Sequence, residues 1–495
     1  IHATEVTGSA AALHLLERLV RGYGNDPKVT RALDTRVFYV VPRLNPDGAE
    51  LALADRPRFV RSSVRRWPLL EPVDGLHEED VDGDGRVLTM RVRDPNGSWK
   101  PHSDDPRVLV PRDPDDGGED GDFYRLLPEG TIRNYDGFSI TVVRPPEGLD
   151  LNRNFPMEWG PEGEQLGAGP YPTSEPEIRA LVQALVERPN VTGYITYHTF
   201  SGVHLRPYSA YSDEHFPTED LRAYELIGKE ATKLTGYPAF SVYHGFRYDP
   251  KTSIKGTADD WVYDHLGVFS WTTEFWSPMR EAGIEDFHPI EWLRDHPPEE
   301  ELQLVRFADE HASGCGYVDW YPFEHPQLGP VELGGWDAMA FWANPPLERL
   351  EREIAPHADF ALFHLLISPH LEIHTLETER IADDTWLVRL VLHNTGWLPT
   401  YVAKKALERK AVRPLEIELE LPEGGRLVSG DRKTEAGQLE GRVQRRSRFA
   451  WLGADDSTTE RAKLEWVIEA PEGADLGFEV RHQRAGTVRR VVTLA

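Results

Sequence analysis

The sequence is poor in the features that mark membrane proteins, nucleic-acid binders and disulfide scaffolds. Cys315 is the one cysteine in 495 residues, so no internal disulfide can form. No run of 18 or more apolar residues occurs, which excludes a membrane-spanning helix of ordinary length. Lys and Arg number 55 against 83 Asp and Glu, and the net charge of −28 disfavours nucleic-acid backbones and anionic membrane surfaces. We therefore expect a soluble protein that binds neither nucleic acid nor membrane.

The chain also lacks an initiating methionine and the charged and apolar segments of a signal peptide. It begins directly at Ile1-His2, and we expect that a preceding segment is missing. The sequence gives no indication of the cellular compartment or of the oligomeric state.

What is present is enough apolar sequence for two or three domains, with 39% hydrophobic residues. Apolar residues at helical spacing predict a helix over residues 7–21, capped by Thr7 or Ser9. A short β-branched run predicts a buried strand over 37–41. Further expected elements are helices over 176–186, capped by Ser174, and 221–234, and strands over 191–198 and 268–274. This succession predicts an α/β domain over residues 1–345, with a mixed, largely parallel central sheet flanked by helices.

Residues 54–144 differ from their surroundings and are expected to form a long insertion, because they are rich in Arg, Asp, Pro and Gly with little periodicity. Within it, Asp80, Asp82 and Asp84 alternate with glycines as at the start of a calcium loop. The twelfth position of that loop is Arg91 instead of glutamate, which excludes an EF-hand. Another type of calcium loop and a solvated acidic turn both remain open.

The last third of the chain changes character. Residues 312–342, rich in Gly, Trp and Pro, are expected to pack around the mouth of the first domain. A helical connector is predicted over 346–368. Beyond it, short alternating runs separated by turn residues predict a C-terminal β-sandwich over 369–495.

The first five residues carry a candidate metal motif. His2 and Glu5 stand three positions apart, and Zn²⁺ binds imidazole nitrogen and carboxylate oxygen. A catalytic zinc usually has three protein ligands, so a third must come from elsewhere in the chain. A histidine and a glutamate at this spacing are also common on exposed helix starts. The motif gains weight only from matching residues later in the chain.

Six short motifs in order resemble the zinc carboxypeptidase family, the metallocarboxypeptidases of the carboxypeptidase A type. They are His2-x-x-Glu5, Asn45-Pro46-Asp47-Gly48, Asp150-Leu151-Asn152-Arg153-Asn154-Phe155, the segment from Gly169 to Glu177, His198 at a strand end, and Asp260-Trp261 followed by Glu274. Each motif is weak alone, but their order over residues 2–274 is specific.

The resemblance implies a zinc ion held by His2, Glu5 and His198, with Glu274 as the general base of peptide hydrolysis. It also implies that Arg153, with Asn152 beside it, binds the C-terminal carboxylate of a peptide substrate. A second arginine would stabilise the oxyanion. Arg61 is our choice for that role, with three competitors, Arg58, Arg65 and Arg66.

Two positions bear on how the substrate is bound. Many members of the family carry a tyrosine that closes over the substrate carboxylate, and Thr252 stands at that spacing here. Tyr243 and Tyr248 lie upstream, and either could take its place. The resemblance also implies that Asp259 falls near the position at which family members set specificity at the base of the pocket, where a buried acid would favour a C-terminal Lys or Arg. The alternative for Asp259 is a helix cap together with Asp260.

The predicted function is therefore a zinc-dependent metallocarboxypeptidase acting on the C-terminal amide bond of peptides. One alternative is a zinc amidase or deacylase that acts on cell-wall peptides or N-acyl amino acids through the same metal site. A further alternative is a non-catalytic binding protein on a peptidase scaffold, although the retained ligands and Glu274 argue against it.

Overall fold

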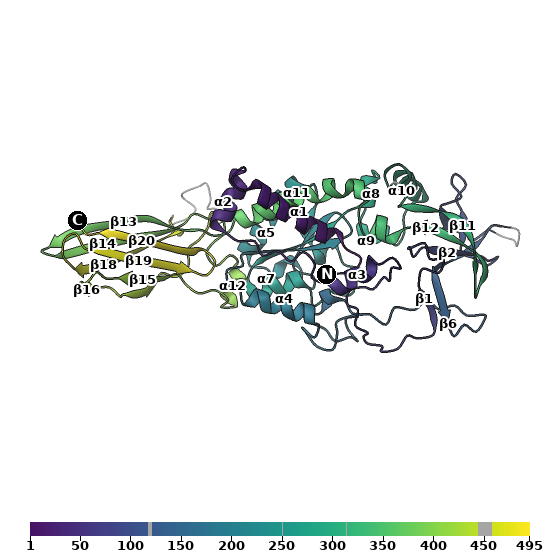
Figure 1. The fold of residues 1–495 in the computed structure, drawn as a ribbon, viewed down its shortest axis with the longest axis horizontal. Helices are drawn as coiled ribbons and strands as arrows, with labels where there is room; N and C mark the ends of the chain where they lie inside the picture. The colour runs from purple at the N-terminus through teal and green to yellow at the C-terminus, as the bar shows by residue number, and fades with distance from the viewer. Residues whose placement is uncertain (117–120, 250, 313, 444–457) are drawn as a thin grey trace.

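The molecule is elongated, with a mixed α/β body in the middle and β-structure at both ends (Figure 1). The computed structural model describes residues 1–116, 121–249, 251–312, 314–443 and 458–495. The C-terminal strands form one end, and strands from the expected insertion form the other (Figure 1). The N-terminus lies in the central body (Figure 1).

Helices surround the central body. The longer ones are α1 (Thr7–Gly22), α2 (Pro27–Thr35), α4 (Pro176–Val186), α5 (Thr218–Thr235), α7 (Ala258–Leu266), α10 (Pro298–His311) and α11 (Leu347–Leu366). Short helical turns are α3 (Pro46–Ala52), η1 (Leu151–Arg153), η2 (Asp213–His215), α6 (Val242–Gly245), α8 (Pro278–Glu281), α9 (Pro289–Trp292), η3 (Ala338–Trp342) and α12 (Lys404–Glu408). The helices expected over 7–21, 176–186 and 221–234 are thus present as α1, α4 and α5.

The expected helix caps are not the ones that form. Val6 precedes α1 without a side-chain cap, and the Thr7 hydroxyl donates instead to Asn344 Oδ1 at 2.8 Å. Glu175 precedes α4, while the Ser174 hydroxyl donates to the Glu175 carboxylate at 2.6 Å. In both cases another residue occupies the N-cap position, so the expected hydroxyl is not placed to accept from the first-turn amides.

The central sheet has the strand order β7-β10-β8-β9. Its strands are β7 (Gly193–Thr199), β8 (Val203–Arg206), β9 (Ala239–Ser241) and β10 (Phe269–Phe275). The pairs β7–β10 and β8–β9 are parallel, whereas β8–β10 is antiparallel. The sheet is therefore mixed, and the expectation of a largely parallel sheet is not confirmed. Helices α1 and α11 cover one face, and α4 and α7 lie on the other (Figure 1).

The strand predicted over 37–41 does not form. Val37, Tyr39 and Val41 are about half exposed, and the segment has no ladder partner in the described parts of the chain. It faces the outer edge of β7 across a cavity of about 480 Å³. An apolar β-branched run becomes a strand only when a neighbouring backbone accepts and donates its hydrogen bonds, and no strand among the described residues pairs with this segment.

The segment expected as an insertion joins a hairpin from much later in the chain. One sheet has the order β11-β12-β2-β5-β3-β4. Its strands are β2 (Thr89–Arg93), β3 (Trp99–Pro101), β4 (Leu109–Pro111), β5 (Tyr124–Pro128), β11 (Tyr317–His325) and β12 (Gly329–Trp336). A separate pair, β1 (Gly75–Glu78) and β6 (Gly130–Arg133), lies beside it. Most of the region expected to pack around the domain mouth therefore completes this outer sheet.

The C-terminal strands form two stacked four-stranded sheets, β13-β14-β18-β16 and β17-β15-β19-β20. Their bounds are β13 (Leu371–Ala382), β14 (Thr385–Asn394), β15 (Glu416–Glu420), β16 (Arg426–Ser429), β17 (Lys433–Glu435), β18 (Arg461–Glu469), β19 (Asp475–His482) and β20 (Gly486–Thr493). Alternate residues of β14 are buried, and Trp386, Trp466 and Phe478 belong to the shared core. This is the sandwich arrangement that the alternation predicted.

Two polar contacts fix the sandwich end to the central body. Asp220 of α5 accepts hydrogen bonds from the backbone amides of Lys404 and Lys405, at 2.7 and 3.1 Å. Arg484 donates to the carbonyl of Gly267, just after α7, at 3.0 Å. Among the residues the structure covers, no helix has both the length and the apolar character needed to cross a bilayer.

Candidate functional site

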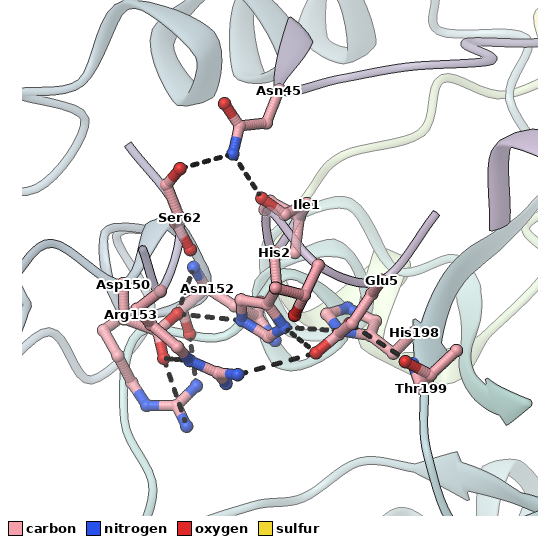
Figure 2. Close-up of polar contacts among 12 residues, drawn as sticks. Ile1, His2, Glu5, Asn45, Ser62, Asp150, Asn152, Arg153, His198 and Thr199 are labelled. Carbon is pink, nitrogen blue, oxygen red and sulfur yellow. Dashed lines mark hydrogen bonds and ion pairs between the residues drawn. The ribbon is translucent and has the colours of Figure 1, made fainter. Parts of the chain in front are cut away.

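Three potential ligand atoms, from His2, Glu5 and His198, lie close together although the residues come from two segments far apart in the chain (Figure 2). His2 and Glu5 precede α1, while His198 lies near the end of β7. His2 Nδ1 is 2.7 Å from Glu5 Oε1, and His198 Nδ1 is 3.0 Å from Glu5 Oε2 and 3.1 Å from His2 Nδ1. All three side chains are nearly shielded from solvent. The predicted ligand set is therefore assembled in space.

The donor set fits a zinc ion. The other nitrogen of His2, Nε2, donates to Asp150 Oδ1 at 3.1 Å, which leaves a lone pair on Nδ1. That lone pair faces a carboxylate oxygen and a second imidazole nitrogen, and three such groups could hold one cation between them. Ligands about 2.0–2.1 Å from a tetrahedral zinc are roughly 3.3 Å apart, close to the observed separations.

Burial and mutual charge set the protonation of these groups. Burial alone would raise the pKa of Glu5, but the charge of His2 and the hydrogen bond from His198 outweigh it and hold the pKa well below its usual value. Burial lowers the pKa of His198 to about 4, so its ring is neutral at pH 7. The ionised carboxylate of Glu5 and the neutral imidazole of His198 are the forms in which such side chains bind metal.

Two contacts fix the N-terminal ligands to the rest of the domain. The Asn45 side chain donates to the carbonyls of Ile1, at 3.0 Å, and Ser62, at 2.7 Å (Figure 2). The backbone amide of Ala3, next to His2, donates to the carbonyl of Arg61 at 3.2 Å. The Asn-Pro-Asp-Gly turn thus holds the first ligand and the Arg61 segment side by side.

Glu274 lies beside the ligand cluster on β10. It is in register with His198 of β7, and both side chains line one cavity of about 170 Å³. Glu274 Oε2 is shielded from solvent and has no hydrogen-bond partner in the described part of the chain. Burial, followed by the negative charge of Glu5, raises the pKa of Glu274 well above its usual value. An unpartnered buried carboxylate facing a cavity can accept or donate a proton there.

Asn152 and Arg153 enter the same cavity from η1. The Asn152 amide plane is fixed because Oδ1 accepts from the backbone amide of Ala258 at 2.9 Å. Arg153 is 7% exposed, donates to the Asn152 carbonyl at 2.7 Å and lies 3.8 Å from Asp150. The Arg153 guanidinium is therefore anchored on one side and presented to the cavity on the other.

Of the four candidate arginines for an oxyanion role, only Arg61 lines this cavity. It donates to Asp150 Oδ2 at 3.0 Å and lies 3.5 Å from Glu5 Oε1. The other three point elsewhere: Arg58 contacts Glu147, Arg65 contacts Glu175, and Arg66 donates to the carbonyl of Leu70. The structure thus places the arginine chosen from the sequence beside the ligand cluster.

Asp259 is a further acidic residue that lines this cavity. It is 2% exposed, and its Oδ2 has no hydrogen-bond partner in the described residues. Burial raises the pKa of Asp259. Its neighbour Asp260 is committed to the fold, because both carboxylate oxygens accept from the Ser209 amide, at 3.1 and 2.9 Å. The cavity that Asp259 lines also has apolar lining residues, which include Leu205, Val242, Phe246, Ile254, Ile290 and Leu293.

Comparison with known families agrees with this geometry. Residues 1–291, more than half of the chain, match the model of the family described as zinc carboxypeptidase. This chain belongs to the zinc carboxypeptidase family. Residues 370–493 separately match a domain of unknown function (DUF8731), which coincides with the β-sandwich.

Individual relatives within the zinc carboxypeptidase family are distant. Carboxypeptidase B2 of Rattus norvegicus is 34% identical over 194 residues, which is 34% of this chain and 42% of that protein. Carboxypeptidase A1 of Mus musculus is 28% identical over 147 residues, which is 28% of this chain and 33% of that protein. The chain therefore spans less than half the length of these relatives.

Among solved structures, the thrombin-activatable fibrinolysis inhibitor is 20% identical with a TM-score of 0.33, covering 61% of this chain and 58% of the other. Carboxypeptidase A from Helicoverpa armigera is 16% identical with a TM-score of 0.34, covering 62% and 58%. These scores add nothing to the family assignment.

The position of the family's closing tyrosine is occupied differently here. Tyr248 lines the cavity that contains Glu274 and Arg153, and is 46% exposed at its mouth. Tyr243 does not line this cavity. The Arg247 guanidinium instead lies over the Tyr243 ring, 4.1 Å from the ring centre. Thr252, at the usual spacing, does not line it either. Of the two candidates from the sequence, Tyr248 is the one near the site.

The acidic loop contributes to a second group of carboxylates, separate from the candidate ligand cluster. Oxygen atoms of Asp80, Asp82 and Glu129 lie within 4.8 Å of one another, whereas Asp84 is not part of this group. The three carboxylates accept hydrogen bonds from loop amides and, at Asp82, from the Tyr321 hydroxyl at 2.6 Å. Arg91, at the twelfth position, donates to Glu332 at 2.8 Å.

Asp150 is a further residue of the candidate site, and no role was predicted for it from the sequence. Asp150 contacts His2, Arg61 and Arg153 together, and so joins the candidate ligand cluster to the two arginines that line the cavity (Figure 2). Burial opposes its ionisation, but Arg153, Arg61 and His2 hold the pKa of Asp150 well below its usual value. The available signal was its place two residues before Asn152 in the matched motif.

Proposed function

We propose that this chain is a zinc-dependent metallocarboxypeptidase that hydrolyses the C-terminal amide bond of peptides. The observation that carries the proposal is the convergence of His2, Glu5 and His198 beside Glu274 on one cavity. Family membership supports the same reaction class. The zinc ion, when bound there, would lower the pKa of water and polarise a peptide carbonyl.

The protein groups supply the proton transfers and the charge stabilisation. Glu274 Oε2 takes a proton from the attacking water as the new C–O bond forms, and passes it to the leaving nitrogen as the C–N bond breaks. The raised pKa of Glu274 suits a group that must both accept and release a proton near neutral pH. Arg61 stabilises the negative charge that develops on the carbonyl oxygen.

Arg153 and Asn152 give the proposed enzyme its preference for a chain end. A free C-terminal carboxylate forms charge-assisted hydrogen bonds with the Arg153 guanidinium, which an internal peptide cannot do. Tyr248, which lines the cavity, donates a hydrogen bond from its hydroxyl to the bound carboxylate and so replaces the tyrosine usual in the family.

We further propose that a C-terminal Lys or Arg is preferred. Asp259 offers an unpartnered carboxylate oxygen, among the described residues, in a cavity that also has apolar lining residues. A long basic side chain would lie along the apolar wall and place its charge beside Asp259, which would restore ionisation of that buried acid.

The test compares zinc content and hydrolysis of C-terminal peptides in the wild type, His198→Ala and Glu274→Gln. The wild type should contain zinc and release C-terminal residues. His198→Ala should lose zinc, whereas Glu274→Gln should keep zinc with turnover reduced by about 10²–10⁴-fold. The exposed His215→Ala is the control and should resemble the wild type.

Two results would contradict this proposal. If Glu274→Gln hydrolysed peptides at the wild-type rate, Glu274 could not be the general base. Zinc-loaded wild type that is inert on every C-terminal peptide but cleaves acyl amides would instead support the deacylase alternative.

A further inference from the structure

The turn immediately after Glu274 adopts a backbone conformation that its own residues do not favour. Trp276, two positions after Glu274, has φ +62° and is fully buried. A bulky residue in the left-handed region is strained, and the surrounding structure must hold it there.

Two side chains hold the backbone amide of Trp276. It donates to Tyr237 Oη and to Glu353 Oε1, both at 3.0 Å. The Tyr237 hydroxyl itself donates to Glu353 Oε1. Glu353 is therefore the acceptor on which both other groups depend.

Glu353 is fixed from a distant part of the chain. It lies on α11 and is 8% exposed. Arg280 of α8 donates to Glu353 Oε1 at 3.1 Å and to Oε2 at 3.4 Å. The Arg280 guanidinium also lies over the Tyr237 ring, 4.8 Å from its centre. A buried carboxylate paired with one cation and two further donors is held in a single geometry.

The turn also connects the two strands that carry the candidate site. The Trp276 carbonyl accepts from the amide of Ser201, three residues after His198, at 2.7 Å. The Trp276 indole donates to the carbonyl of Phe341 at 2.6 Å. Displacing Trp276 would therefore move the end of β10 relative to the end of β7.

We propose that Glu353 is a positioning residue that sets the place of Glu274 relative to the ligand cluster, acting through the backbone of Trp276. This inference rests on the proposed peptidase function. Glu353 touches neither Glu274 nor a ligand, so its effect should appear in turnover and leave substrate affinity and zinc content nearly unchanged.

The acceptor oxygen of Glu353, and not its charge, should carry the effect. In Glu353→Gln the amide oxygen can still accept from Trp276 and Tyr237, whereas Glu353→Ala removes the acceptor altogether. Both variants remove the charge that pairs with Arg280. A role carried by the charge alone would therefore affect the two variants alike, whereas a role carried by the acceptor oxygen would not.

The experiment measures kcat and KM on a C-terminal peptide, zinc content, and backbone hydrogen exchange in zinc-loaded protein. In Glu353→Ala we expect kcat to fall about 10–100-fold with KM changed less than about threefold. In Glu353→Gln kcat should stay within about threefold of the wild type. Exchange over residues 199–202 and 274–277 should accelerate in Glu353→Ala and not in Glu353→Gln.

Asp220→Ala is the matched control, because Asp220 is also a buried carboxylate that accepts from a tyrosine, Tyr263, and from backbone amides. It lies at the contact with the sandwich end and should lower stability without changing kcat or exchange after Glu274. If Glu353→Ala does not fold, Tyr237→Phe is the replacement variant. It removes one acceptor of the Trp276 amide and should therefore reduce kcat.

Equal kcat losses in Glu353→Ala and Glu353→Gln would overturn the inference, as would an unchanged kcat in Glu353→Ala. Wild type that cleaves no C-terminal peptide would overturn the proposed function instead. Even then, unchanged exchange over 274–277 in Glu353→Ala would show that Glu353 does not hold the turn.

Discussion

Glu274 and His198 occupy paired positions in the parallel strands β10 and β7, next to the ends of both strands. Paired residues of adjacent parallel strands project to the same side of the sheet. The proposed general base and one proposed zinc ligand are therefore brought together by strand register, 76 positions apart in the chain. The groups that surround this pair can each be tested by substitution.

Removing the Asp150 carboxylate should weaken zinc binding. Asp150 fixes the His2 ring by accepting from Nε2, and such partners of a ligand are worth about 10–100-fold in metal affinity. Asp150→Ala should therefore bind zinc about 10–100-fold more weakly, measured by competition with a chelator. Asp150→Asn keeps an acceptor oxygen and should lose less. Affinity as high in Asp150→Ala as in the control Asp220→Ala would contradict the role.

Arg153→Ala should impair substrates with a free C-terminal carboxylate. Losing a charge-assisted bond should raise KM about 10–100-fold for these substrates. The same peptide with an amidated C-terminus lacks the charge and should be affected little. Arg58→Ala, which removes an arginine outside the cavity, is the control. Equal losses on free and amidated peptides would show that Arg153 does not bind the substrate carboxylate.

Asp259→Asn should reduce the preference for basic C-terminal residues. The change keeps the shape of the side chain and removes the charge that would pair with Lys or Arg. We expect the ratio of kcat/KM for C-terminal Lys over Leu to fall by about 10–100-fold. Asp260→Asn, at the neighbouring buried acid, should leave that ratio unchanged. A wild type that prefers Leu or Phe would remove the basis for this prediction.

Tyr248→Phe tests the closing residue. If its hydroxyl donates to the bound substrate, kcat/KM should fall by about 5–10-fold, the worth of one hydrogen bond. Tyr243→Phe removes a hydroxyl outside the cavity and should be silent. The reverse pattern, a loss in Tyr243→Phe alone, would assign the role to the other tyrosine.

Buried His364 should make the metal-free protein sensitive to acid. Burial lowers the pKa of His364 to about 4, below the usual value near 6.5 in an unfolded chain. The unfolded state then binds more protons, so the stability contribution is present above pH 6.5 and is lost as the pH falls toward 4. At pH 5 the loss is about 2 kcal/mol.

Urea unfolding of metal-free protein at pH 7 and pH 5 would measure that loss. His364→Gln should show a smaller drop in the free energy of unfolding between the two pH values than the wild type. His215→Gln, at an exposed histidine, should match the wild type. Equal drops in His364→Gln and the wild type would exclude His364 as a source of acid sensitivity.

Much of the local structure could be predicted because it depends on nearby residues. The apolar spacing of α1, α5 and α11 and the alternation in β14 appear directly in the sequence. Residues 37–41 have the same β-branched character as a buried strand, yet form none. Whether such a run becomes a strand depends on a partner backbone, which its own composition does not specify.

The choice among similar residues could not be made from the sequence. Arg61 was preferred from the sequence but could not be separated firmly from Arg58, Arg65 and Arg66, and of these four only Arg61 lines the cavity. Tyr243 and Tyr248 were likewise equal until one was placed at the cavity mouth. The outer sheet was also unpredictable, because β2 pairs with β12 more than 230 residues later.

The sequence by itself determined the family motifs, the candidate ligands His2, Glu5 and His198, and the β-sandwich, because motif identity and hydrophobic period are local properties. The tertiary structure decided which groups face one another: Glu274 beside His198 through strand register, and Asp150 among His2, Arg61 and Arg153. It also placed Glu353 beneath the turn after Glu274. Those contacts join residues up to 148 positions apart, and only the packing of helices and strands brings such residues together.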